Sequence, residues 1–347
     1  MINFVKESAP HLRRKSSVSR MMIDVIIALL PTLVFATVVY TFQLVWPLLI
    51  SIVTMVGAEF VWFGLTHMIK FDGKKHTLVE RFKYAYKDYT VNNLIVPLVS
   101  AIIYTLILAP TMPLYGFFVG ALVGIVIGKL VFGGTGSNIF NPAGVGMVFA
   151  KLCFGSKITY TDNWFFTIPD VSAGGTALGS AVNGIENIYQ FNLLDMFIGK
   201  MPGTLGEAFS VTLLIGGIYL LVRRAADWRI MLTYFGTFSI MMLFAGLCIH
   251  SLYNDIGVWY YLAFQILSGG LLFGGIFMLT DPVTSPTNRP GRVIYAMIAA
   301  VCTVFIRIFG SLPEGVGFSI LIANIMPWHS SKAKKNSKGS YFITRRL

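Results

Sequence analysis

The sequence has few charged side chains. Asp, Glu, Lys and Arg make up 12% of its 347 residues, while 55% of the residues are hydrophobic; an ordinary soluble domain carries about a quarter charged residues. So few charges cannot form the polar shell that covers the core of a soluble protein of this size. The composition excludes a soluble globular enzyme and indicates that lipid surrounds the protein. Its 28 Phe, 15 Tyr and 34 aperiodic Gly also exclude disorder, collagen and coiled coil.

Cysteine is also scarce. Cys153, Cys248 and Cys302 each lie within an apolar run and show no Cys-x-x-Cys spacing, whereas zinc and iron–sulfur sites need clustered ligands. The chain also lacks a Gly-x-Gly-x-x-Gly fingerprint after a strand, which a nicotinamide cofactor would need. We therefore expect no metal site in this chain, and we place nicotinamide and iron–sulfur sites on other chains.

Long apolar runs are abundant. About 20 apolar residues can cross the hydrocarbon core of a bilayer as a helix, and we predict ten such spans: 21–42, 46–69, 93–110, 113–132, 139–155, 207–222, 230–250, 258–279, 293–310 and 315–328. The fifth includes Asn141-Pro142, so we expect a helix that is broken at its start. The first lacks a small-residue cleavage site and is expected to stay. The predicted fold is an all-α polytopic membrane protein of about ten helices.

The basic residues determine the expected orientation. Of the 27 Lys and Arg, 22 lie in alternate segments that include residues 1–20 and the tail 329–347. Cytoplasmic loops of membrane proteins carry such an excess. We therefore predict that both termini are cytoplasmic, in the cell (inner) membrane. This placement also explains the net charge of +12 without a nucleic-acid partner.

The segment 156–206 is then the one long loop on the outer face. It is polar and rich in Gly and Ser around residues 172–180. Loops of this length are uncommon between spans unless they have a function. A connector without a function is the alternative.

Two similar motifs suggest an internal repeat. Phe132-Gly-Gly precedes Asn141-Pro142, Phe273-Gly-Gly precedes Asp281-Pro282, and the two prolines are 140 positions apart. Five spans in each half, 21–155 and 207–328, would place the halves in opposite orientations, as in many transport proteins. We expect the two Pro-centred segments to bind a ligand or ion, and Asn141, Asp281 and Thr284 are the candidate residues there. For Gly120, Gly124 and Gly128 we expect a role in helix packing.

Ionisable residues in the predicted spans are the second functional signal, because a carboxylate in hydrocarbon is costly. Glu59 and Asp281 are our first candidates for an ion path, and Asp24 is the next. Lys129 and Arg307 could neutralise them, although the sequence does not determine the pairing.

Three stretches resemble a known family. They are Phe132-Gly-Gly-Thr-Gly-Ser-Asn-Ile-Phe-Asn-Pro-Ala-Gly144, Thr280-Asp-Pro-Val-Thr-Ser-Pro286 with Gly291-Arg292, and Ser8-Ala-Pro-His11. They are similar to the D subunit of the Rnf complex and to its homologue, the B subunit of the sodium-pumping NADH:quinone oxidoreductase. The resemblance spans essentially the whole chain. The quinone-reducing homologue is longer at its N-terminus, so the length favours the Rnf subunit.

This resemblance implies a covalent flavin. Family members carry FMN that is joined through its phosphate to a threonine, in a motif written Ser-Gly-Ala-Thr followed by Pro-Leu. The matching run is Ala173-Gly-Gly-Thr-Ala-Leu178, in which the threonine, the middle glycine and the leucine match and the other positions differ. It implies Thr176 as the attachment site. Gly174 and Gly175 would let backbone amides approach the phosphate, and Ser172 adds a hydroxyl.

The function implied by the resemblance is that of a flavoprotein subunit of an ion-translocating ferredoxin:NAD oxidoreductase. It would pass electrons through FMN, couple them to sodium or proton transport, and work with other membrane and peripheral Rnf subunits in the lipid bilayer. A second, noncovalent flavin such as riboflavin is also implied, with the two Pro-centred segments and Phe140 as walls. The alternative from the residues alone is a solute channel or secondary transporter with an inverted repeat. A structural scaffold for the complex is a third possibility.

Overall fold

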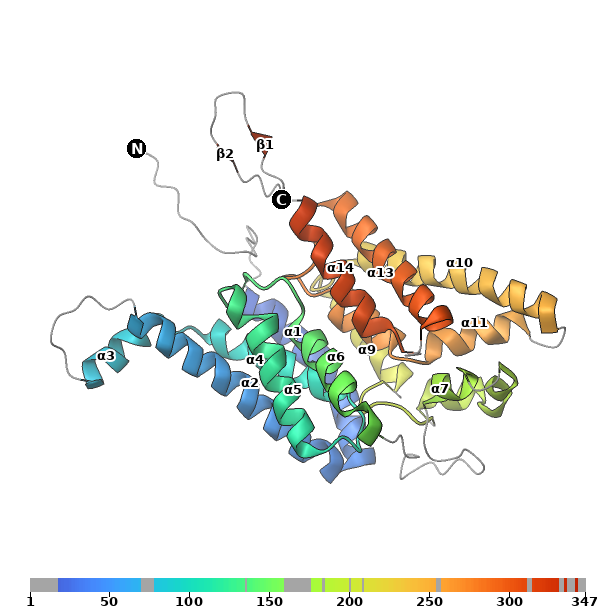
Figure 1. Cartoon of the computed structure of the whole chain (residues 1–347), viewed down its shortest axis with the longest axis horizontal. Coiled ribbons are helices and arrows are strands. Elements are labelled where there is room, and N and C mark those ends of the chain that lie inside the picture. The colour runs from blue at the N-terminus through green and yellow to red at the C-terminus, as the bar shows by residue number, and fades with distance from the viewer. Residues whose placement is uncertain are drawn as a thin grey trace.

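The fold is built mainly from long apolar helices (Figure 1). The structure is a computed structural model, and it describes residues 18–69, 78–134, 136–158, 176–182, 185–199, 201–207, 209–253, 257–310, 314–330, 334–335 and 341–342. Four α-helices in this part are long and apolar enough to cross a membrane, and a fifth span joins α5 to the 3-10 helix η1: α1 (Val18–Tyr40), α2 (Phe42–Ile69), α5 (Leu114–Gly128) with η1 (Leu130–Phe132), α10 (Trp228–Tyr253) and α13 (Arg289–Phe309). The chain is an all-α polytopic membrane protein.

The remaining predicted spans are bent or short. Helix α11 (Val258–Leu267) continues as α12 (Leu271–Phe273) and the π-helix η4 (Gly274–Met278) after a bend of 61°. Four helices have only 13 to 16 residues: α4 (Val91–Leu106), α6 (Pro142–Phe154), α9 (Ser210–Val222) and α14 (Val316–Ser330). The predicted spans 93–110, 139–155 and 207–222 were longer than the helices found there, whereas α14 agrees with the predicted span 315–328. A helix of this length covers about 20–24 Å, and a helix can end inside a membrane only where protein satisfies its backbone.

Shorter elements lie between these helices. They are α3 (Leu78–Ala85), the 3-10 helices η2 (Gly155–Lys157) and η3 (Ile185–Gln190), α7 (Ala177–Val182), α8 (Leu193–Ile198), and the paired two-residue strands β1 (Lys334–Lys335) and β2 (Tyr341–Phe342). Helices α7 and α8 lie in the long loop predicted at 156–206. The loop therefore has secondary structure of its own.

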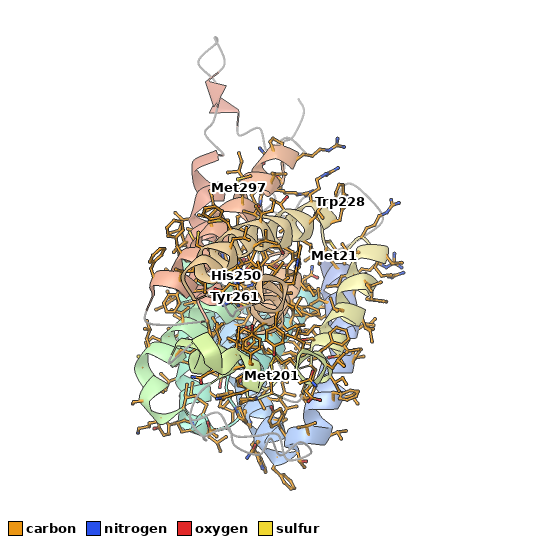
Figure 2. All side chains as sticks on the ribbon, turned by 90° about the vertical axis from the view of Figure 1, so that its right-hand side faces the viewer. Met21, Met201, Trp228, His250, Tyr261 and Met297 are labelled. Carbon is orange, nitrogen blue, oxygen red and sulfur yellow. The ribbon has the colours of Figure 1, made fainter. Side chains whose placement is uncertain are left out.

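The outward faces of the long helices are apolar. On α1, the side chains of Val34, Phe35 and Val38 are more than half exposed. Figure 2 shows that such carbon-rich side chains surround the ribbon. Lipid tails are the solvent that suits this surface.

The helices pack in the same order in each half of the chain. Helix α2 packs against α4 and α5, and α5 packs against α6; likewise α10 packs against α11 and α13, and α13 packs against α14. Helix α1 packs against α9, and α6 against α14, so the halves meet along two helix pairs. The opposite orientation of the halves stays a prediction.

The two Phe-Gly-Gly motifs are not at equivalent places in this order. The first follows α5, the fourth element of its half, whereas the second lies at η4, within the third element of the other half. The internal repeat predicted from these motifs therefore matched each element of one half with a neighbour of its true equivalent in the other half. The motifs nevertheless meet in space, because the side-chain amide of Asn141 donates to the carbonyl of Met278 at 3.3 Å.

Small residues allow α5 and α6 to pack closely. A Cβ atom on Gly124 would lie 2.6 Å from the carbonyl oxygen of Pro142, and one on Gly128 would lie 2.8 Å from Pro142 Cα. On Gly120 a Cβ would collide with the Tyr104 hydroxyl. The packing role predicted for these three glycines is confirmed.

We expect Gly124→Ala to destabilise the protein by about 1–3 kcal/mol, because the new methyl group meets backbone that cannot move aside. Gly57→Ala is the matched control on α2, since a Cβ there would have nothing within 4 Å. Thermal unfolding of the detergent-purified variants, followed by tryptophan fluorescence, measures the difference. Equal midpoints for the two variants would contradict this account of the α5–α6 contact.

Candidate functional site

A cavity of about 320 Å³ lies in the described part of the protein. Its walls come from both halves of the chain and from the outer loop. Thr176, the predicted attachment residue, is one of the lining residues, together with Ile107, Met147, Lys151, Gly155, Ile158, Gly179, Thr204, Glu207, Gly269, Gly270, Phe273, Gly274, Met278, Glu314, Gly315, Val316, Gly317 and Phe318. The volume lies in the range of small-molecule sites.

One wall is the break between α11 and α12. Gly269 and Gly270 have φ angles of +69° and +66°, which L side chains rarely adopt. Because the helix ends here, its last carbonyl groups need other donors. Arg307 supplies them: its guanidinium donates to the carbonyls of Gln265, Ser268 and Gly269 at 2.6 to 3.1 Å. Arg307 therefore stabilises the break and does not neutralise a predicted ion-path carboxylate.

Thr176 lies directly before α7. Its side chain is buried, with 6% of its surface exposed, and its hydroxyl oxygen accepts a hydrogen bond from the Gly179 amide at 3.0 Å. This bond begins the helix. Ser172, Gly174 and Gly175 lie outside the described residues. Thr204 lines the same cavity.

Charged residues at this cavity were missed by the sequence reasoning. Glu207 lies three residues before α9, and Lys151 of α6 forms an ion pair with Glu314, which lies just before α14. The pattern Thr204-x-x-Glu207 before an apolar run is a capping-box signal that could have drawn attention to Glu207. Lys151 and Glu314 are 163 positions apart in sequence, so only the fold shows that they pair.

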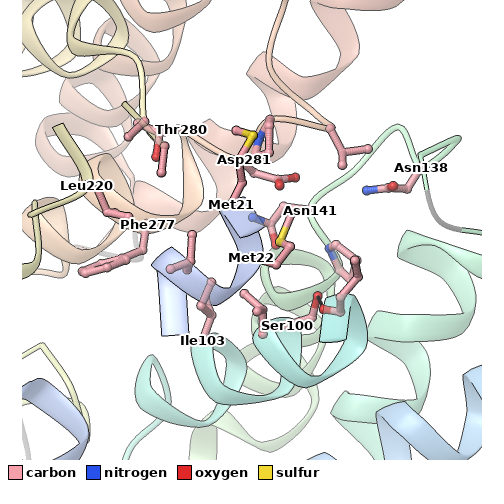
Figure 3. Close-up of a pocket in the computed structure, with 18 of the residues that line it drawn as sticks. Met21, Met22, Ser100, Ile103, Asn138, Asn141, Leu220, Phe277, Thr280 and Asp281 are labelled. Carbon is pink, nitrogen blue, oxygen red and sulfur yellow. Dashed lines mark hydrogen bonds between the residues drawn. The ribbon is translucent and has the colours of Figure 1, made fainter. Parts of the chain in front are cut away.

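A second, smaller cavity of about 40 Å³ lies where the two Pro-centred segments meet (Figure 3). Figure 3 shows Asn141 and Asp281 beside each other at its wall. The Asn141 side chain accepts from the amides of Ala143 and Gly144, which caps α6. Thr284 donates to the Asp281 carboxylate at 3.0 Å. Phe140 is not among the lining residues of this cavity.

The two cavities share a wall. Asn141 lines the smaller cavity, and its side-chain amide donates to the carbonyl of Met278. Met278 in turn lines the larger cavity. The segments that were predicted to bind a ligand therefore separate two cavities.

Glu59 of α2 is paired with Lys129. The ammonium group lies 3.0 Å from the carboxylate, and the Lys129 and Glu59 side chains are 0% and 5% exposed. Lys129 also lines the smaller cavity, as does Asp281. The structure thus brings the two first-ranked ion-path candidates near one cation.

Asp24 has a different environment. It is buried on α1, and its carboxylate accepts hydrogen bonds from Arg223 and Tyr219, each at 3.1 Å. Both partners lie at the end of α9, so Asp24 joins α1 to α9.

Comparison with known proteins identifies the family of this chain. The model of the NQR2, RnfD, RnfE family matches residues 5–329. The chain belongs to this family.

The chain is also similar in sequence to individual proteins. The relatives are B subunits of the Na(+)-translocating NADH-quinone reductase: the chain is 38% identical over 231 residues to that of Chromohalobacter salexigens, 36% over 240 residues to that of Ectopseudomonas mendocina, and 35% over 232 residues to that of Pseudomonas aeruginosa. These matches cover 65% of this chain and 55–56% of the relatives. The chain therefore spans about half the length of the curated relatives it matches.

The family match includes both cavities and the buried Glu59–Lys129 pair. We expect Glu59→Gln to destabilise the protein by about 3–5 kcal/mol, because it leaves the Lys129 charge buried without its partner. The double variant Glu59→Gln/Lys129→Met should recover most of that loss. Thermal midpoints of the purified variants test this expectation, and a double variant no more stable than Glu59→Gln would contradict it.

Proposed function

We propose that this chain is a flavoprotein subunit of a redox-driven, ion-translocating oxidoreductase in the cell (inner) membrane, with FMN joined to Thr176 through a phosphoester. The observation that carries the proposal is the position of Thr176. This threonine belongs to the one motif in the outer loop that resembles a flavin attachment site, and it lines the cavity of about 320 Å³. The names of the relatives, as subunits of a Na(+)-translocating NADH-quinone reductase, support the redox class.

The cavity and its lining residues fit a flavin in four respects. The volume of about 320 Å³ suits a ligand of this kind. Apolar residues such as Ile107, Met147 and Phe273 would contact a ring, and the Lys151 ammonium could offset part of a phosphate charge. Gly269 and Gly270, at the break after α11, have no side chains that would occupy space at this wall of the cavity.

When bound, FMN supplies the electron transfer. The Thr176 oxygen would hold the group in the cavity, and the surrounding apolar side chains would exclude water from it. Arg307 keeps the break between α11 and α12 in its shape by satisfying the backbone carbonyls. These residues therefore bind and orient, while electron donors and acceptors lie on partner subunits.

Within this class we propose the Rnf complex, a ferredoxin:NAD oxidoreductase, with both termini of this chain cytoplasmic and with other membrane and peripheral Rnf subunits as partners. The family includes RnfD and NQR2 alike. Purified complex that reduces NAD with reduced ferredoxin supports the Rnf assignment. Complex that instead reduces quinone with NADH assigns the chain to the other branch.

The second, noncovalent flavin stays a prediction. The smaller cavity holds about 40 Å³, which is room for a water molecule or two but not for an isoalloxazine ring. The described residues that line the smaller cavity do not fit that group.

We expect Thr176→Val to abolish the flavin fluorescence of this subunit in a denaturing gel, because valine has no oxygen to form the phosphoester. The protein should remain in the membrane in normal amount, as judged by immunoblot. Thr204→Val is the matched control, since Thr204 lines the same cavity, and it should keep the signal.

Full fluorescence of the Thr176→Val variant would overturn the assignment. A wild-type protein that is colourless after purification of the whole complex would favour the solute transporter.

We also propose that Glu59 and Asp281 belong to the ion path, for sodium or protons. Asp281→Asn, in complex reconstituted into vesicles, should leave flavin fluorescence unchanged and lower the number of ions moved per electron or alter the dependence on sodium. The Glu59→Gln/Lys129→Met variant should behave likewise. Asp88→Asn is the control because Asp88 is exposed, in the turn after α3. An unchanged ratio and sodium dependence in both variants would remove these residues from the path.

A further inference from the structure

Glu207 is a buried carboxylate at the larger cavity for which the proposed function has no role. Its side chain is 6% exposed, and Thr204 donates to its Oε2 atom at 3.1 Å. A Cβ atom on Gly270 would lie 3.7 and 3.8 Å from the two carboxylate oxygens. The carboxylate is therefore directed at the break between α11 and α12, which is a wall of the cavity.

Among the described residues, the two cations nearest this carboxylate each bind another group. Lys151 of α6 is paired with Glu314, and Arg307 of α13 is bonded to the carbonyls at the end of α11. The Tyr40 phenol on α1 is a further titratable group near Glu207 in the described part of the chain. Within the described chain, the hydrogen bond from Thr204 is the direct contact that favours a charged Glu207.

This environment affects the ionisation of Glu207, which lies outside the membrane-spanning helices. Burial, followed by the like charge of Glu314, raises the pKa of Glu207 to about 7, against the opposing effects of Lys151, the Thr204 hydrogen bond and Arg307. At neutral pH the side chain can therefore be either protonated or ionised.

We propose that Glu207 is the proton-exchanging group of this cavity: its carboxylate takes up a proton when an electron enters the cavity and releases it when the electron leaves. This inference rests on the proposed function. One electron, from a reduced one-electron carrier on a partner subunit, adds one negative charge. One proton from the aqueous phase then forms an O–H bond at the carboxylate, so the net charge of the cavity is unchanged. Loss of the electron reverses both steps.

The physical reason is the cost of charge in a medium of low dielectric. An added charge that is not compensated costs far more in such a cavity than in water. A sodium ion could also compensate it, but hard cations need about six oxygen ligands. Within the described residues, Glu207 and the Thr204 side chain hydrogen-bonded to it supply three side-chain oxygen atoms, fewer than such a cation needs.

The test compares wild type with Glu207→Gln in the assembled, flavin-loaded complex. Glutamine keeps the size of the side chain and can still accept from Thr204, but it cannot titrate. We expect the plot of flavin midpoint potential against pH to lose its inflection near pH 7. Infrared difference spectra between low and high pH should show a carboxyl band in wild type that is absent from the variant.

Glu314→Gln provides a second variant if Glu207→Gln is made poorly. Because Glu314 raises the pKa of Glu207, its removal should shift the inflection and the infrared titration to lower pH without abolishing either. Lys151, freed from its partner, would act in the same direction.

Identical potential profiles in wild type and Glu207→Gln overturn the inference, as does an infrared band that remains in the variant. The inference is also overturned if Glu207→Gln keeps the pH dependence of the flavin midpoint potential and loses only its dependence on sodium concentration. Glu207 would then be a sodium ligand. The infrared titration, repeated in Thr176→Val, needs no flavin. Suppose that the infrared titration of Thr176→Val still shows the Glu207 band while this variant keeps its flavin fluorescence. The assignment of the flavin to Thr176 is then wrong, but the titration of Glu207 stands.

Discussion

A helix that ends inside a membrane leaves backbone carbonyl and amide groups that hydrocarbon cannot satisfy. Several helix ends in the described part of this protein are buried, and they meet donors or acceptors from side chains or from other segments. Arg307 donates hydrogen bonds to the carbonyls at the end of α11, and Asn141 bonds the start of α6 and the end of η4. The amides of Leu205 and Gly206 donate to the carbonyls of Leu108 and Leu106 at the end of α4. Both cavities lie next to these ends, so the broken helices create the space for a ligand.

The buried charges follow the same constraint. The buried pair Glu59–Lys129 and the partly buried pair Lys151–Glu314 each join different helices or their ends. A buried pair contributes little net stability, yet removing one partner is costly. The pairs therefore hold the helices in register. Lys129 lines the smaller cavity and Lys151 the larger one, so each pair also sets the charge of a cavity where the proposed function requires ions or electrons.

Much of the architecture could be predicted from sequence because it depends on composition and local pattern. The apolar runs predicted α1, α2, α5, α10 and α13, and the small residues Gly120, Gly124 and Gly128 predicted close packing. The short helices α4, α6 and α9 were predicted too long, because hydropathy does not show where a chain leaves the helix while staying apolar. Leu108, for example, is as apolar as the helix before it, but it follows the end of α4 and is buried outside that helix.

The sequence by itself determined that the chain lies in a membrane, which residues are candidates for a ligand, and that Thr176 stands in a flavin-like motif; these follow from residue types that are near one another in the chain. Only the tertiary structure decided which charges pair, that Glu207 faces the same cavity as Thr176, and that the two Pro-centred segments meet at Asn141 and Met278. Residues more than a hundred positions apart form the Asn141–Met278 and Lys151–Glu314 contacts. Their free energies depend on distance and burial, and both exist only after the helices have packed.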